Sequence, residues 1–159
     1  MFVTGTNDVQ RDLNRLLIKS LEGYPCVSYD MESWWDKPFV LLHATRKYGK
    51  VVWVDNDVEI VSKEFFSILD IPATSASWDA PASNFNTGVI VINEEHAYNW
   101  AINLDYTKHG DQDSFPKPDY YLDSRFNSLR LAPVPNAYAH HHTGAAKWKY
   151  LNDNQSSLL

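Results

Sequence analysis

The chain has 159 residues, 44% of them hydrophobic, with a net charge of −6 and an isoelectric point of about 5.4. That length fits one domain with a core of its own, and the acidic balance excludes a broad nucleic-acid-binding face. The lone cysteine, Cys26, excludes an internal disulfide, and no run approaches the ~18 apolar residues of a membrane span. Because residues 1–10 lack a signal-peptide pattern, we expect a soluble cytoplasmic protein.

Strands and helices are predicted to alternate along the first half of the chain. Residues 1–4 form a strand that ends at Gly5, and Asn7 or Asp8 begins a helix. The apolar face of this helix consists of leucines at helical spacing: Leu13, Leu16, Leu17 and Leu21. A second strand is expected at residues 26–29.

The next predicted helix is marked by a residue at each end. Pro38 suits its first turn and Gly49 its C-terminal stop. Its inward residues are predicted to be Phe39, Leu42 and Ala44. A strand at residues 50–54 follows, and then a helix near residues 62–69 capped by Ser62.

The second half resumes the alternation after a loop-rich stretch, residues 72–86. The continuous Val/Ile run of FNTGVIVIN predicts a strand at residues 87–93 that is buried on both faces. Helices near residues 94–104 and 119–126 and a strand near residues 129–132 come next. Strands alternating with helices predict a three-layer α/β sandwich.

The segment VVWVDNDVEI places Asp55 and Asp57 one residue apart at the carboxyl end of a predicted strand. In an open α/β sheet, ligands collect at that edge. Two neighbouring carboxylates repel each other, and a hard divalent ion such as Mn²⁺ or Mg²⁺ would keep both ionised. The alternative is a loop in which one Asp caps the following helix and the other is solvated.

The same segment also fits the start of a dehalogenase-like phosphatase, in which the first Asp is the covalent nucleophile. That motif belongs on the first strand of such an enzyme. Asp55 instead follows a full strand–helix region, and no GDxxxD-like acidic pair comes later. We therefore rank this hypothesis below a metal site.

Three further segments carry groups suited to a sugar or a phosphate. FNTGVIVIN puts Asn86 and Gly88 at the start of a buried strand, where an amide could hold a hydroxyl and glycine allows close backbone approach. GDQD clusters hydrogen-bond acceptors. HHHTGAAKWKY brings three histidines near Lys147, which could complete a metal site and meet a diphosphate. Each segment has a plainer alternative. FNTGVIVIN could be an ordinary turn into a strand, GDQD a solvated turn, and a histidine of HHHTGAAKWKY a structural residue.

In this order, the segments VDND, FNTGVIVIN, GDQD and HHTGAAKW resemble those of GT-A glycosyltransferases, most closely the retaining family of glycogenin and the lipopolysaccharide galactosyltransferases. The chain looks like an unusually short member. The resemblance implies a Rossmann-like nucleotide-diphospho-sugar transferase fold with a mixed central sheet. Residues 1–151 would form this single domain, and residues 152–159 a flexible tail.

The resemblance also implies a metal and diphosphate site. Asp55 and Asp57 would bind Mn²⁺ or Mg²⁺ on the donor diphosphate, and His141 takes the position of the third metal ligand. Lys147 would neutralise the leaving diphosphate. Because histidines 140–142 are adjacent, the register of the third ligand is open.

The remaining implied contacts are with the donor. They are Thr6, Asn7 and Asp8 at the nucleobase and ribose, Asn86, Asp111 and Gln112 at the sugar, Gly144 beside the diphosphate, and Lys37 at the sugar or a phosphate. Of these groups, Asp111 and Gln112 would act in catalysis together with Lys147.

The resulting hypothesis is a metal-dependent glycosyltransferase that moves a sugar from a nucleotide-sugar to a saccharide or other hydroxyl acceptor. A UDP-sugar is the favoured donor, and the anomeric configuration of the sugar would be retained. The metal and Lys147 would stabilise charge on the leaving group. The alternatives are a nucleotide-sugar hydrolase, a nucleotide-sugar- or glycan-binding module without turnover, and the phosphatase. The donor sugar, the acceptor and the oligomeric state are left open.

Overall fold

A six-stranded mixed sheet forms the centre of the computed structural model, which describes residues 1–80 and 82–158. Across the sheet the strands are β2 (Cys26–Asp30), β1 (Phe2–Thr6), β3 (Val51–Val54), β6 (Asn84–Ile92), β5 (Ser75–Asp79) and β7 (Tyr120–Tyr121). β1 is parallel to β2 and β3, whereas β6 is antiparallel to both β3 and β5, and β7 is parallel to β5. The predicted mixed α/β sheet is confirmed.

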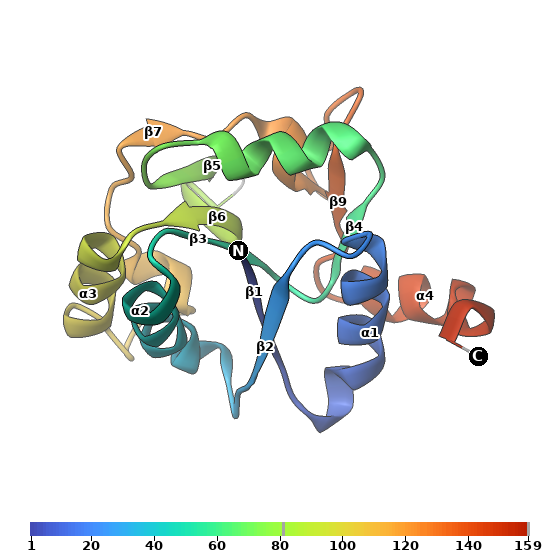
Figure 1. Ribbon diagram of the computed structural model, residues 1–159, viewed down its shortest axis with the longest axis horizontal. Helices are drawn as coiled ribbons and strands as arrows, with labels where there is room; N and C mark the ends of the chain where they lie inside the picture. The colour runs from blue at the N-terminus through green and yellow to red at the C-terminus, as the bar shows by residue number, and fades with distance from the viewer. Residues whose placement is uncertain (81, 159) are drawn as a thin grey trace.

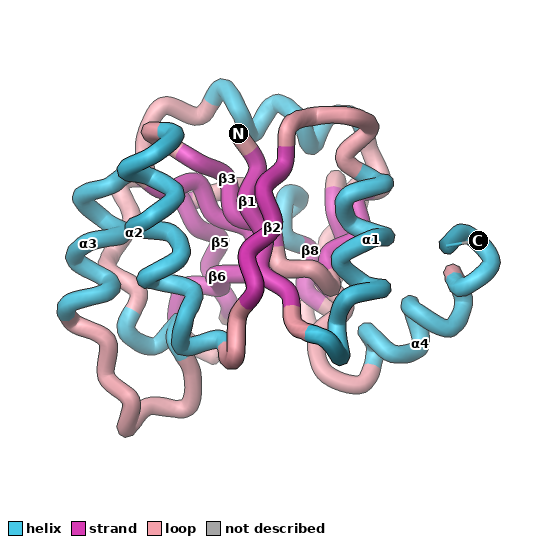
Figure 2. The backbone as a smooth tube through the Cα atoms, turned by 60° about the horizontal axis from the view of Figure 1, so that its bottom comes forward, coloured by secondary structure: helices cyan, strands magenta, loops and turns pink. Residues whose placement is uncertain are grey.

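Helices and a second, smaller sheet cover the two faces of the central sheet (Figures 1 and 2). On one face, α2 (Lys37–Tyr48) lies beside α3 (Glu94–Ile102). On the other lies α1 (Arg11–Ser20), with α4 (Ala146–Asp153) packed beyond it. The small sheet on this side has the order β4 (Val58–Ile60), β9 (Ala139–His141) and β8 (Ser128–Leu129).

Short 3₁₀ segments connect these elements. They are Asp8–Gln10, Trp34–Asp36, Lys63–Asp70, Asp111–Ser114, Ser124–Asn127 and Gln155–Leu158. Three of them, Asp8–Gln10, Trp34–Asp36 and Asp111–Ser114, border the cavity described below.

The core confirms that the central strands are buried on both faces. In β3, Val52 and Val54 pack toward α1, whereas Val51 and Trp53 pack toward α2 and α3. The Val/Ile run of β6 alternates in the same way between the two sides. Because side chains of a strand point alternately to opposite faces, a continuous apolar run is what a doubly covered sheet requires.

The helix after the second strand has the predicted ends. Pro38 lies in the first turn of α2, and Gly49 ends the helix with a φ of 75°, a conformation that glycine adopts without strain. Of the predicted inward residues, Ala44 is buried, but Phe39 is 48% exposed, because α2 turns Leu41 rather than Phe39 to the sheet. At the N-terminus, β1 continues through Gly5 to Thr6 instead of ending there.

Two predicted helices differ from the structure in part. In the 119–126 segment, the backbone N–H groups of Tyr120 and Leu122 donate to the carbonyls of Thr74 and Ala76, so the segment begins as the edge strand β7. Only its end, from Ser124, is helical, as part of a 3₁₀ helix. The helix near residues 62–69 is present as the 3₁₀ helix Lys63–Asp70, but the Ser62 hydroxyl donates to the Glu64 carboxylate instead of capping the backbone. Long-range pairing overrides local helical spacing in the first case.

Besides β7, three described strands lie outside the predicted set. β5 falls in the stretch expected to be loop-rich, because its small residues are buried by β6 and β7 without an apolar pattern of their own. β4 and β9 pair across a long sequence separation. The strand expected near residues 129–132 is limited to β8 and a bridge between Leu129 and Ala132.

The predicted tail overlaps the end of α4 and the last 3₁₀ segment, where the Ser157 carbonyl accepts a hydrogen bond from Lys19 Nζ at 2.8 Å. Its flexibility stays a prediction, and residue 159 lies outside the described residues. Among residues 1–80 and 82–158, no helix has the length and apolarity needed to span a bilayer.

Candidate functional site

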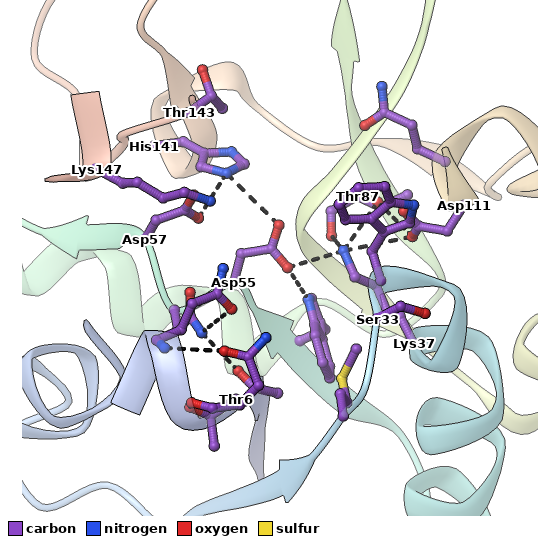
Figure 3. Close-up of a pocket in the computed structure, with 18 of the residues that line it drawn as sticks. Thr6, Ser33, Lys37, Asp55, Asp57, Thr87, Asp111, His141, Thr143 and Lys147 are labelled. Atoms are coloured by element: carbon purple, nitrogen blue, oxygen red, sulfur yellow. Dashed lines mark hydrogen bonds and ion pairs between the residues drawn. The ribbon is translucent and has the colours of Figure 1, made fainter. Parts of the chain in front are cut away.

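A cavity of about 400 Å³ lies at the carboxyl ends of β1 and β3. Because β6 runs antiparallel to β3, the first residues of β6 reach the same edge. The walls come from the ends of β1 and β3, the start of β6, the turn before α2, the Asp111–Ser114 segment, and the chain from β9 into α4. Segments far apart in the sequence therefore meet in one space (Figure 3).

The loop after β3 turns two carboxylates into this cavity. The Asp55 N–H donates to the Gly88 carbonyl at 2.7 Å, and the Val58 N–H donates to the Asp55 carbonyl at 3.1 Å. Between the two acids, the Asn56 amide donates to the Gly5 carbonyl at 3.0 Å and to Gln10 Oε1 at 3.1 Å. Asn56 thus fastens the loop to β1 while its neighbours face the open space.

Asp55, Asp57 and His141 form a cluster whose ligand atoms all lie within 4.8 Å of one another. His141 Nε2 is 3.1 Å from Asp57 Oδ1 and 3.7 Å from Asp55 Oδ2 (Figure 3). The other Asp55 oxygen, Oδ1, accepts from the Trp53 indole at 2.6 Å and pairs with Lys37 Nζ at 2.9 Å. One oxygen of Asp55 is therefore held in place while the second faces the cluster.

The position of His141 follows from the alternation of β9. His141 is buried, whereas His140 is exposed on the opposite face of the strand. The Nδ1 atom of His141 lies 3.1 Å from Asn127 Oδ1, and this contact orients the ring with Nε2 toward the two carboxylates. A Cβ at Gly88 would overlap the His141 ring, so glycine is needed there for close approach.

His142 faces away from the cluster. Its Nε2 lies 2.9 Å from Glu59 Oε2, and its ring stacks on Tyr150 with centroids 4.3 Å apart. Burial raises the pKa of Tyr150 to about 12, so this stack keeps a neutral phenol. Of the three adjacent histidines, His141 is the one that the fold brings to Asp55 and Asp57.

Lys147, in the first turn of α4, brings a positive charge to the same group. Its Nζ lies 3.6 Å from Asp57 Oδ2. Burial would raise the pKa of Asp57, but the hydrogen bond and charge of His141, with the charge of Lys147, lower that pKa below its usual range. Burial would likewise lower the pKa of His141, and its hydrogen bond to Asp57 holds that pKa above its usual range.

Lys37 is a buried cation between two carboxylates. Its Nζ lies 2.9 Å from Asp55 Oδ1 and 3.6 Å from Asp111 Oδ2. Burial would lower the pKa of Lys37, but Asp111 and Asp55 outweigh it and raise that pKa. Burial raises the pKa of Asp111 against the opposing charge of Lys37. Lys37 thus links the Asp55–Asp57–His141 cluster to the GDQD segment.

Asn86 lines the cavity, but its amide is already engaged. Its Oδ1 accepts from the Gly88 N–H at 2.9 Å and from Asn127 Nδ2 at 2.8 Å, and its Nδ2 donates to Asp79 at 3.3 Å. In the described structure it supports the residue that orients His141. Its expected contact with a donor sugar stays a prediction.

The other predicted residues divide between the cavity and its surroundings. Thr6, Asn7 and Gln112 line it. Asp8 lies outside, with a side chain 92% exposed and paired with Arg11. Gly144 is also outside the lining and takes a φ of 64° in the turn that leads to α4.

Sequence reasoning missed several residues of the site. Asn127 orients His141, and Ser33 and Trp34 form part of the wall. Trp34 could have been suspected from the abundance of aromatic residues. Asn127 carries no local signal, because it reaches the site through the pairing of β8 with β9.

The donor set fits a hard divalent cation. Two carboxylates and an imidazole nitrogen converge, and the 3.7 Å gap between His141 Nε2 and Asp55 Oδ2 is too long for a hydrogen bond. Carboxylate oxygens with one imidazole suit Mn²⁺, and Mg²⁺ accepts the same oxygens.

The whole arrangement is similar to that of solved glycosyltransferases. One acts in glycosylation of the major capsid of PBCV-1, with 15% identity and a TM-score of 0.70 over 95% of this chain and 98% of that one. The galactosyltransferase LgtC, solved with donor and acceptor sugar analogues, has 14% identity and a TM-score of 0.73 over 98% of this chain and 95% of that one. GlyE of Streptococcus pneumoniae has 13% identity and a TM-score of 0.63, and 64% of that chain is covered.

The fold is therefore the GT-A fold of glycosyltransferases, as predicted. No protein-family model and no curated protein matches this sequence, so the likeness rests on the arrangement in space.

Proposed function

We propose that this protein is a metal-dependent glycosyltransferase that moves a sugar from a UDP-sugar to a hydroxyl acceptor with retention. The observation that carries the proposal is the convergence of Asp55, Asp57 and His141 beside Lys147 in a cavity of the GT-A fold. The lone cysteine supports a cytoplasmic location as a further part of the proposal.

The metal would be held by Asp55 Oδ2, Asp57 and His141 Nε2, and would supply positive charge for the donor diphosphate. Lys147 would stand on the same side and balance the charge that develops on the leaving diphosphate. Because Lys37 holds one oxygen of Asp55, that carboxylate keeps its orientation without the ion.

Asp111 and Gln112 would hold the hydroxyl groups of the donor sugar. Lys37 fixes the Asp111 carboxylate, and the Thr87 hydroxyl donates to the same Asp111 oxygen at 3.4 Å. A side chain restrained in this way can orient a sugar without losing further rotamer freedom. Thr6 and Asn7 would border the nucleoside.

A thermal-shift screen tests the proposal. UDP, GDP, ADP and CDP are each added with and without Mn²⁺, and the melting temperature is measured. We expect stabilisation by UDP that requires Mn²⁺, because a ligand at about 100 times its Kd adds roughly 2.7 kcal/mol to the free energy of unfolding. Absence of any shift with every nucleotide and metal combination would overturn the proposal.

Turnover assays then separate the alternatives. A transferase consumes a UDP-sugar faster when an acceptor is present, a hydrolase consumes it equally without one, and a binding module consumes none. The anomeric configuration of the product, read by NMR, tests retention. Inversion would contradict that part of the proposal alone.

A further inference from the structure

A second cavity, of about 470 Å³, adjoins the first. The two share three lining residues, Trp34, Asp111 and Gln112. Asp111 and Gln112 are the pair proposed to hold the donor sugar. The second cavity therefore begins where the transferred sugar would end, and its described lining includes none of Asp55, Asp57 and His141.

The polar wall of this cavity is ordered by its own hydrogen bonds. Gln112 Nε2 donates to Asn84 Oδ1 at 3.3 Å, and Asn84 Nδ2 donates to Asp113 Oδ1 at 2.5 Å. Within residues 1–80 and 82–158, Gln112 Oε1 and Asp113 Oδ2 accept no side-chain hydrogen bond. Two fixed acceptors thus remain for the hydroxyl groups of a ligand.

The lining of this cavity also includes an exposed aromatic ring, that of Trp34. Trp34 is 58% exposed although its backbone is held in a capping box, in which the Ser33 hydroxyl accepts from the Trp35 N–H and Asp36 accepts from the Ser33 N–H. An apolar ring and oriented polar acceptors in one cavity match a pyranose, which has a C–H face and hydroxyl groups around its edge.

The charge of the cavity selects among saccharides. Asp111 and Asp113 both line it, and none of its described lining residues is Lys or Arg. The charge of Lys37 balances that of Asp111, but Lys37 lines the first cavity and not the second. His109 also lines the cavity, but the Asp113 carboxylate pairs with no Lys or Arg among the described residues. An anionic sugar would meet this negative charge, so a neutral pyranose is favoured.

We propose that this second cavity is the acceptor subsite and takes a neutral pyranose that stacks on Trp34 and hydrogen-bonds to Asp113 and Gln112. Its role as acceptor rests on the proposed transferase function. The acceptor oxygen bonds to the anomeric carbon, the bond from that carbon to the diphosphate oxygen breaks with its electron pair, and the hydroxyl proton leaves on the diphosphate.

Saturation-transfer NMR with methyl β-glucoside, methyl β-galactoside and methyl β-glucuronide tests the subsite without any donor. The variants are Trp34→Ala and Asp113→Ala. The matched control is Trp78→Ala, which removes another half-exposed tryptophan, 46% exposed, that lines neither cavity. The UDP and Mn²⁺ thermal shift is measured on every protein.

We expect at least one neutral glycoside to bind the wild type and Trp78→Ala equally, and both subsite variants about tenfold or more weakly. The glucuronide should not bind. Equal binding by Trp34→Ala, preference for the glucuronide, or no binding of either neutral glycoside would overturn the subsite while leaving a UDP shift intact. Saccharide binding without any UDP shift would instead overturn the proposed function, and with it the acceptor role.

Discussion

Asp57 lies between two basic side chains of the proposed metal site. One of its oxygens faces His141 and the other faces Lys147, so its charge balances two cationic groups. Removing it leaves the imidazole and the ammonium without their shared partner, and a metal would lose one carboxylate ligand.

We therefore predict that Asp57→Ala loses the Mn²⁺-dependent UDP shift and lowers transfer by about 10²–10³-fold. The shift is read by thermal unfolding and the transfer by donor consumption. Asp12→Ala, which removes an exposed carboxylate paired with Arg15, should keep both. A wild-type rate in Asp57→Ala would rule out the metal-based mechanism.

Lys37 shows how a buried charge affects stability. Its ammonium lies between Asp55 and Asp111, and its side chain is 6% exposed. We predict that Lys37→Met lowers the free energy of unfolding by about 3–5 kcal/mol, because two carboxylates lose their buried partner. Urea denaturation measures this change. Lys47→Met, at an exposed position, should stay within about 0.5 kcal/mol of the wild type.

Adding Asp111→Asn to Lys37→Met should recover part of the loss, since one of the unpaired charges disappears. If the double variant is less stable than the single one by the full cost of Asp111→Asn alone, the two residues are not coupled.

Cys26 is the residue for which we predict a pH dependence. Burial raises the pKa of its thiol from 9.0 to about 11. Near neutral pH the folded protein therefore holds on the order of a hundredfold less thiolate than the unfolded chain, and we expect correspondingly slow alkylation by iodoacetamide. Above pH 9 the unfolded state loses its proton first, so this contribution to stability falls as the pH rises toward 11. Equal alkylation rates with and without urea would contradict the prediction.

At the scale of elements, the site depends on how closely β6 approaches β9. Gly88 has no side chain, and the His141 ring occupies the space that a Cβ would need. We predict that Gly88→Ala displaces His141, weakens Mn²⁺-dependent UDP binding and costs about 1–3 kcal/mol of stability. The control is Gly110→Ala, where a Cβ meets nothing within 4 Å. Calorimetry with Mn²⁺ and UDP measures binding, and an unchanged Kd in Gly88→Ala would show that the ring has room to move.

The elements also show where sequence reasoning succeeds. The Val/Ile runs of β3 and β6 and the Pro38 and Gly49 ends of α2 are local signals, and the structure follows them. The DxD pair could be placed at a strand end for the same reason. β5 could not, because its residues lack a strand pattern, and β7 and β9 could not, because their partners are distant in sequence. Asn127 was missed because it reaches His141 through one of those pairings.

At the scale of the whole molecule, the first cavity is formed by chain segments that are separate in the sequence. Its walls come from β1, β3, β6, the turn before α2, the 3₁₀ segment at Asp111 and the β9–α4 connection. A ligand that fills it would restrain all of them together, because each contributes a face.

We predict that UDP with Mn²⁺ slows backbone hydrogen exchange in these separate segments at once. The helix α3, which does not line the cavity, serves as the internal control. Exchange is followed by mass spectrometry. Protection confined to the loop after β3 would show that the nucleotide contacts one wall of the cavity alone and would contradict the prediction, whereas equal protection of α3 would indicate general stabilisation.

Because the proposed ligands adjoin the small sheet, the site is expected to unfold at a lower denaturant concentration than the central sheet. Asp57 accepts a backbone hydrogen bond from His142, and Val58 pairs with His141, so two proposed ligands adjoin the same short ladder. That ladder is three residues long in β4 and two in β8, whereas β6 in the central sheet has nine. Mild denaturant would open the shorter ladder first. Inactivation would then precede any large change in circular dichroism, and an inactive sample of this protein could still look folded.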